Sequence, residues 1–153
     1  MGRKKELIVR VRGVRSLPSA ARRPRLYAEA VRQAFRALKS DRTGEICVVF
    51  VSRARMLEMN RRYLNHDYDT DVITFEHESL PGVPADETAL GDIIVSAWMV
   101  RRQARELHHA PAHEAAILTA HGALHLLGLD DRHPRSKARM FQIQTRIASL
   151  LRA

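Results

Sequence analysis

Two histidines, His121 and His125, stand four residues apart in an apolar stretch of the chain. Residues four apart lie on the same face of a helix, and two imidazoles placed in this way are close enough to hold one metal ion. Histidine pairs with this spacing also occur without a metal, as hydrogen-bonded side chains of a protein core. The pair alone therefore leaves both interpretations open.

Candidates for a third ligand follow the pair directly. Gly128 is suited to end the helix in a left-handed conformation. The chain can then fold back and bring Asp130, Asp131 or His133 to the open side of the pair. Two imidazoles and one further protein ligand leave a fourth position for water, as in catalytic rather than structural zinc sites. The segment thus predicts a metal centre near the end of a helix.

The residue after His121 distinguishes this pattern from that of zinc peptidases. The peptidase pattern His-Glu-x-x-His needs a glutamate there as general base, whereas this chain has Gly122. His113 and Glu114 could begin the same peptidase pattern, but Ile117 occupies the position of its second histidine. A peptidase is therefore disfavoured, and a metal hydrolase of another substrate class is kept as an alternative.

Apolar periodicity predicts the elements that position these residues. The expected strands cover residues 7–11, 45–51, 71–75 and 90–95, and the expected helices cover residues 24–38, 53–63, 97–107, 113–127 and 134–151. Ser52 and Ser96 are suited to cap two of the helices. The helix with the histidines is apolar nearly all round and is expected to be buried. A long loop over residues 76–88 is expected to be functional or mobile.

Strands and helices mix along the chain without a strict alternation. This order predicts an α+β fold. No internal repeat or linker interrupts the 153 residues. We therefore expect a single domain over residues 1–153, with a mixed β-sheet of about four strands packed with helices and the metal site on a buried helix.

Arginine dominates the charge of the chain. Lysine and arginine together number 26 against 17 acidic residues, a net charge of +9, and 22 of the 26 are arginine. The planar guanidinium binds phosphate through two parallel hydrogen bonds, so this balance is consistent with a nucleic-acid partner. An arginine-rich proteome would produce the same composition. Aromatic content is only 5%, so surfaces on which bases could stack are expected to be sparse.

The single cysteine and the N-terminus favour a cytoplasmic protein. Cys47 has no second cysteine to pair with, and its apolar surroundings predict a small buried side chain in a reducing compartment. The basic residues 1–5 run directly into charged residues, without the apolar core of a signal peptide. No stretch approaches the ~20 apolar residues that span a bilayer.

Three motifs together resemble a known family. The pattern His-Gly-x-Leu-His-Leu-x-Gly-x-Asp over residues 121–130 resembles the signature of the YbeY endoribonucleases, the 16S rRNA maturation factors of bacteria. Residues 60–75, with Asn60, Tyr63 and the stretch Thr-Asp-Val-Ile-Thr-Phe, resemble a second family stretch, and the Gly-Asp-Ile of residues 91–93 resembles a third. The likeness covers roughly residues 45–150, and the N-terminal third matches only in general pattern.

The resemblance implies a metal-dependent hydrolase with one Zn²⁺ per chain that cleaves single-stranded RNA. It implies a role in rRNA processing, namely 16S rRNA 3′-end maturation, and in ribosome quality control. The expected partners are rRNA and the small ribosomal subunit in the cytoplasm, without DNA or membrane. The sequence assigns no catalytic residue beyond the metal ligands.

The third ligand departs from the family pattern. The family usually has a histidine six residues after the second one, and here that position is Asp131. A carboxylate binds zinc but makes the metal a weaker Lewis acid and favours harder ions. We predict His121, His125 and Asp131 as the ligands, with His133 as the alternative third ligand. Asp130 matches a family aspartate and is expected to support the site or to cap the next helix.

A second departure is Leu64, where the family commonly has an arginine that is thought to be important for cleavage. Leucine cannot bind phosphate, so Arg61 or Arg62 takes over that role, or the role is reduced. A solvated helix face is the alternative interpretation of these two arginines. Together with Asp131, Leu64 also favours a rival hypothesis, that of a non-catalytic ribosome assembly factor with a structural metal.

Overall fold

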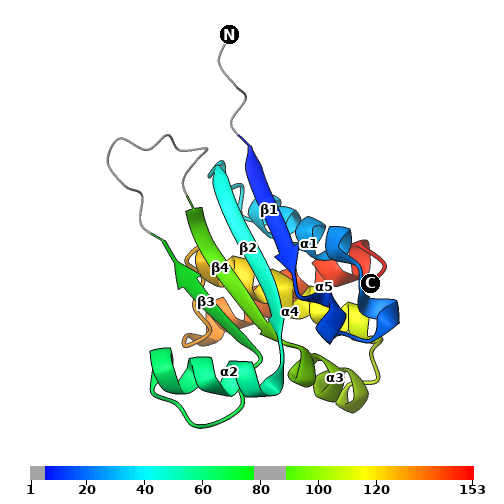
Figure 1. Cartoon of the computed structure of the whole chain (residues 1–153). Coiled ribbons are helices and arrows are strands. Elements are labelled where there is room, and N and C mark those ends of the chain that lie inside the picture. The colour runs from blue at the N-terminus through cyan, green and yellow to red at the C-terminus, as the bar shows by residue number, and fades with distance from the viewer. Residues whose placement is uncertain (1–5, 78–88) are drawn as a thin grey trace.

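The computed structural model describes residues 6–77 and 89–153. Its centre is a four-stranded sheet in the order β1-β2-β4-β3 (Figure 1). The strands are β1 (Leu7–Arg12), β2 (Gly44–Val51), β3 (Val72–Glu76) and β4 (Ala89–Ser96). β1, β2 and β4 run parallel, and β3 is antiparallel to β4. The predicted α+β fold with a mixed four-stranded sheet is therefore confirmed. Most of the loop expected over residues 76–88 lies outside the described residues, as do residues 1–5.

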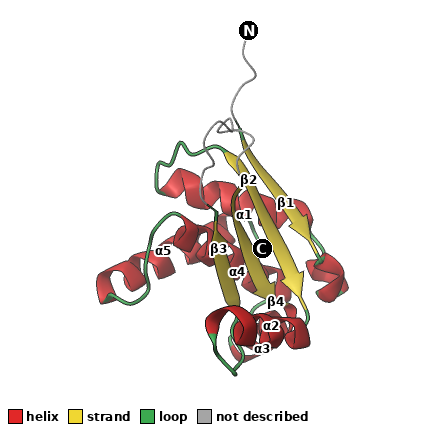
Figure 2. Cartoon of the chain, turned by 60° about the vertical axis from the view of Figure 1, so that its left-hand side comes forward, coloured by secondary structure: helices red, strands yellow, loops and turns green. Residues whose placement is uncertain are grey.

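Helices cover the two faces of the sheet unequally. The helices are α1 (Pro24–Ala37), α2 (Arg53–Met59), α3 (Ala97–Glu106), α4 (Pro111–Leu126) and α5 (Pro134–Leu150). α1, α4 and α5 pack together on one face, α2 covers one end of the other face, and α3 lies at the end of the sheet against α4 (Figure 2). Within the described residues, no helix combines the length and apolar character needed to span a membrane.

The side-chain alternation of β2 separates these two faces. Ile46, Val48 and Phe50 are buried in the main core between the sheet and α1 and α4. Cys47 belongs to the intervening set on the opposite face, where α2 does not cover the whole sheet, and it is only half-buried. The expectation of a buried Cys47 is therefore wrong, because strand residues alternate between faces. Burial and the nearby Asp92 raise the pKa of the Cys47 thiol.

Two predicted helix boundaries differ from the structure by more than one residue. The helix expected over residues 53–63 ends as α2 at Met59 and continues as a π-helical turn (Asn60–Leu64). The cause is Asn60, whose buried amide donates to the Tyr68 carbonyl and accepts from the Thr70 hydroxyl, so that it anchors the following loop. α4 begins at Pro111, two residues before the expected start, because proline is well suited to the first helical position. The caps predicted at Ser52 and Ser96 are confirmed.

α4 is the central helix of the fold. It contacts α1, α3, α5, β3 and β4, and 12 of its 16 residues are buried, which confirms the burial expected from its apolar sequence. It lies very close to the sheet at Gly122, where a Cβ atom would lie 2.5 Å from Cγ2 of Ile93 and 3.1 Å from Cγ1 of Val72. The glycine after His121 therefore serves packing, because any side chain at this position would push α4 away from the sheet.

We predict that Gly122→Ala destabilises the protein. Alanine is favoured over glycine in a helix by ~1 kcal/mol, but overpacking a core typically costs about 1–3 kcal/mol. The free energy of unfolding, measured by urea denaturation, should therefore fall. In an Ile93→Ala background the same substitution should cost less, since the clashing Cγ2 is gone. An equal cost in both backgrounds would contradict the packing argument.

Candidate metal centre

The C-terminal end of α4 turns the chain back toward its own histidines. Gly128 adopts a left-handed φ of 96°, and its N–H donates to the His125 carbonyl at 2.9 Å. The N–H of Leu129 donates to the Leu124 carbonyl at 3.1 Å. This pair of bonds is a Schellman motif, which satisfies the free carbonyls of the last helical turn. The helix end predicted at Gly128 is confirmed, and the turn directs residues 130–133 back along the helix.

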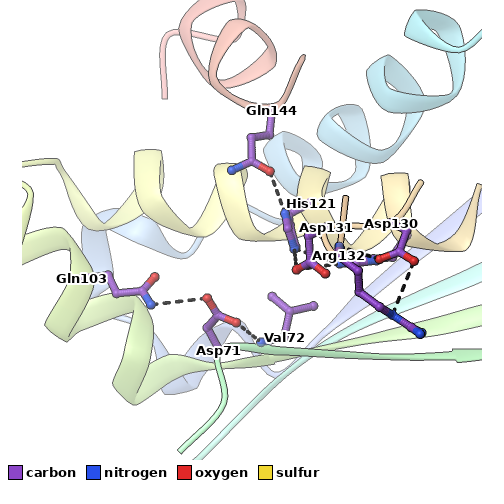
Figure 3. A network of polar contacts seen from close by, with 9 residues as sticks. Asp71, Val72, Gln103, His121, Asp130, Asp131, Arg132 and Gln144 are labelled. Atoms are coloured by element: carbon purple, nitrogen blue, oxygen red, sulfur yellow. Dashed lines mark hydrogen bonds and ion pairs between the residues drawn. The ribbon is translucent and has the colours of Figure 1, made fainter. Parts of the chain in front are cut away.

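The turn brings Asp131 next to the two histidines. The Nε2 atoms of His121 and His125 lie 2.9 Å apart, and Oδ2 of Asp131 lies 4.0 Å and 3.8 Å from them. Each of the three residues offers one potential ligand atom, and these three atoms all lie within 4.8 Å of one another. Figure 3 shows Asp131 beside the ring of His121. His133, the alternative third ligand, lies outside this group.

The hydrogen bonds of the two imidazoles orient their Nε2 atoms toward one another. Nδ1 of His121 donates to Oε1 of Gln144 at 2.7 Å, and the backbone of Leu129 hydrogen-bonds His125. The Nδ1 proton of His121 therefore points to Gln144, which leaves Nε2 of His121 free to accept. Burial lowers the pKa of His125, and the adjacent His121 lowers it further. Two neutral imidazoles that both offer Nε2 can bind one cation.

The observed spacing fits a small divalent cation. Two ligands of tetrahedral zinc, with bonds of about 2.0–2.1 Å, lie roughly 3.3 Å apart. The histidine nitrogens are slightly closer than this, and the carboxylate oxygen is slightly farther. Because Asp131 is exposed on a loop, a small movement of its side chain would complete a three-ligand set.

Gln144 is a functional candidate that the sequence did not reveal. It comes from α5, 23 residues after His121, and reaches across to the ring as Figure 3 shows. Partners of this kind fix the tautomer and the orientation of metal-binding histidines. Its sequence surroundings show only an ordinary half-polar helix, so the contact depends on how α5 packs on α4.

The neighbouring Asp130 fits the first of its two expected roles, support of the site, and not the second, a cap of the next helix. Oδ1 of Asp130 accepts from the N–H of Arg132 at 2.7 Å, and Oδ2 lies 3.4 Å from the Arg132 guanidinium. Asp130 therefore stabilises the turn that carries Asp131. It does not cap α5, whose N-cap residue is His133, because the chain is still turning at residue 130.

Arg61 and Arg62, which were expected to take over the role of the family arginine at position 64, lie on the surface. Arg61 pairs with Asp67 at 2.6 Å, and the Arg62 guanidinium lies 5.5 Å from the centre of the Tyr63 ring. Leu64 is 39% exposed at the end of the π-helical turn. The structure thus places both arginines on a solvated face with local partners. Exposed arginines also follow the metal group in sequence, at Arg132, Arg135 and Arg139.

A pocket of about 410 Å³ adjoins the metal group. It runs between α4 and α5, and His121 and Gln144 line it together with Asp71 from the loop before β3. Asp71 accepts from the N–H of Val72 at 2.8 Å and from Nε2 of Gln103 at 3.3 Å. His121, one of the two candidate histidine ligands, therefore borders a pocket large enough for part of a substrate.

Comparison with known proteins agrees with the motifs. A family model described as "Endoribonuclease YbeY" matches residues 16–152. The chain belongs to the YbeY endoribonuclease family. The match extends well before residue 45, where the recognisable motifs begin, so α1 is part of the family domain, whereas β1 precedes the matched residues.

Individual YbeY relatives are similar over most of their length. A protein of Limosilactobacillus fermentum is 35% identical over 131 residues, 80% of this chain and 83% of the relative. One of Listeria welshimeri is 36% identical over 120 residues, 72% and 74% of the two chains. Both are named Endoribonuclease YbeY. The solution structure of a Thermotoga maritima protein supports the fold. It is 23% identical, and it superposes on this chain with a TM-score of 0.57 over 94% of this chain and 89% of the Thermotoga chain.

We predict that Gln144→Ala weakens zinc binding by roughly 10–100-fold, the usual effect of losing a partner of a ligand histidine. Without Gln144, the His121 proton is free to move to Nε2 and block coordination. Zinc titration with a competing chelator measures the affinity. Gln142→Ala is the matched control, since Gln142 is an exposed glutamine of the same helix. Equal affinities for the two variants would contradict this role of Gln144.

Proposed function

We propose that this chain is a metal-dependent endoribonuclease that cleaves single-stranded RNA. The observation that carries the proposal is the facing pair of Nε2 atoms at 2.9 Å, with Asp131 on their open side. It occurs in a chain whose relatives are named Endoribonuclease YbeY. Phosphodiester hydrolysis is a reaction for which such a three-ligand centre is well suited.

Zn²⁺ is the proposed cofactor, one ion per chain, held by His121, His125 and Asp131. Two imidazoles and one carboxylate are a common catalytic zinc set, and the carboxylate widens tolerance toward harder ions. The bound metal would supply Lewis acidity toward a phosphoryl oxygen. The chain holds the histidine rings through Gln144 and the backbone of Leu129, and its exposed arginines attract the RNA backbone.

The proposed substrate is ribosomal RNA. We infer a role in 16S rRNA 3′-end maturation and ribosome quality control, with the small ribosomal subunit as partner in the cytoplasm. Residues 1–153 act as one ribonuclease domain, without DNA or membrane as partner. The net charge of +9 supports a polyanionic partner.

The alternative is a non-catalytic assembly factor with a structural metal. Asp131 and Leu64 favour it, because both depart from the family pattern at the proposed centre of cleavage. Cleavage of an unstructured RNA by zinc-loaded protein, abolished by chelation and restored by zinc, supports the enzyme. Stoichiometric zinc and ribosome association without any cleavage would support the assembly factor instead.

The third ligand is tested by comparing Asp131→Ala with His133→Ala. Loss of a residue that hydrogen-bonds a metal ligand typically weakens metal affinity by roughly 10–100-fold. We expect Asp131→Ala to weaken zinc affinity by more than this, because a direct ligand is gone. His133→Ala should retain zinc. Metal analysis of the purified variants and zinc titration measure both effects. Full zinc in Asp131→Ala combined with loss in His133→Ala would reverse the assignment.

A basic residue at position 64 should increase cleavage. Leu64 is partly exposed, so an arginine there could bind a phosphate through its guanidinium. We expect Leu64→Arg to raise kcat/KM on unstructured RNA several-fold. Leu150→Arg adds the same charge at an exposed leucine of α5 and controls for non-specific attraction. A similar gain in both variants would mean that net charge, not a contact at position 64, is responsible.

A further inference from the structure

The pocket beside His121 carries an exposed aromatic side chain. Phe141 lines the pocket and is 64% exposed, which places its ring at the rim. It precedes Gln144 by three residues on α5, so the two side chains share one helix face. Because Gln144 holds His121, the ring of Phe141 lies about one helical turn from a side chain that contacts the metal group.

The interior of the pocket combines an apolar wall with hydrogen-bonding groups. Ile117 and Leu118 of α4 form part of the wall between Glu114 and His121. Opposite them, each carboxylate oxygen of Asp71 already accepts one hydrogen bond, from Val72 or from Gln103. A carboxylate oxygen has two acceptor sites, so Asp71 can still accept from a bound molecule.

Among the described lining residues only histidines can become cationic, so the charges of the pocket disfavour a phosphate as its occupant. Asp71 and Glu114 both line it, and no lysine or arginine is among the described residues that do so. Glu114 is 3% exposed and lies 3.2 Å from the His109 ring. An aromatic rim, an apolar wall and hydrogen-bond acceptors suit a flat, neutral, hydrogen-donating group, which is the chemistry of a nucleobase.

We propose that this pocket binds the base of a nucleotide adjacent to the cleaved phosphate, with Phe141 stacking on the base and Asp71 accepting a hydrogen bond from it. The inference rests on the proposed RNA cleavage and deepens it. A base must be unpaired to enter a pocket of this kind, so the pocket itself selects single-stranded RNA. Asp71 favours bases with an exocyclic amino group, such as cytosine, over uracil.

Binding of mononucleotides tests the pocket without any cleavage. Cytidine and uridine 5′-monophosphate, with ribose 5-phosphate as a probe that lacks a base, are titrated into ¹⁵N-labelled protein and followed by NMR. We expect both nucleotides to shift the amide signals of residues 141–145, cytidine monophosphate to bind more tightly, and ribose 5-phosphate to leave these signals unchanged. Equal shifts from ribose 5-phosphate, or tighter binding of uridine monophosphate, would overturn the corresponding part of the proposal.

Variants locate the contacts. Phe141→Ala should weaken nucleotide binding by roughly 5- to 150-fold, the usual range for one base–aromatic stack, and Phe141→Tyr should retain it. Leu150→Ala is the matched control, because Leu150 is 63% exposed on the same helix and does not line the pocket. Asp71→Asn should reduce the preference for cytidine over uridine monophosphate. Unchanged binding in Phe141→Ala, or preferential binding of an arginine-containing peptide, would contradict a base-binding pocket.

A cleavage assay separates this inference from the proposed function. Phe141→Ala should lower kcat/KM on intact single-stranded RNA. An RNA with an abasic nucleotide beside the cleaved bond should also lower kcat/KM of the wild type. In Phe141→Ala the abasic nucleotide should cause no further loss of kcat/KM. If the wild type cleaves RNA and neither change matters, the pocket inference fails and the function stands. If the wild type cleaves nothing yet binds nucleotides through Phe141, the function fails and base binding stands.

Discussion

The close contact between α4 and the sheet is the constraint on which the metal group depends. α4 packs against strands and helices on several sides, and at Gly122 it approaches Ile93 so closely that a side chain would not fit. This contact fixes the rotation and height of the helix. His121 is the preceding residue, so its ring is directed away from the sheet toward α5 and the pocket. A shift of α4 by a fraction of an ångström would move both histidines relative to Asp131 and Gln144.

The packing at Gly122 also explains why this helix does not carry the chemistry of a zinc peptidase. Such an enzyme places a glutamate directly after its first histidine. Here that position faces the sheet at a distance that only glycine tolerates. Acidic groups near the centre instead come from other elements, namely Asp131 after the helix and Asp71 before β3. These two carboxylates belong to loops that the packing brings together, whereas Glu114, which lines the pocket farther along, belongs to α4.

The site joins two environments with different electrostatics. On one side, His121, His125 and Asp131 form a group suited to a cation, and exposed arginines follow in the chain. On the other side, the pocket between α4 and α5 carries carboxylates, histidines and an aromatic ring but no lysine or arginine among its described lining. A nucleic acid has phosphates and bases that match these two environments separately. The net positive charge would attract the backbone, while the pocket is suited to a base.

The sequence by itself determined the features that depend on neighbours along the chain. The helix of the two histidines, its burial, its end at Gly128 and the caps at Ser52 and Ser96 were all predicted, because they follow from spacings of a few residues. The mixed sheet and the family were also recognisable from ordered motifs. Tertiary structure decided that Asp131, rather than His133, lies beside the pair. It also decided that Gln144 holds His121 and that Phe141 stands at a pocket next to it. Asp131 is placed by the turn after Gly128, whereas the other two relations depend on how α5 packs against α4. Residues that meet across packed elements leave no periodic signal in the sequence.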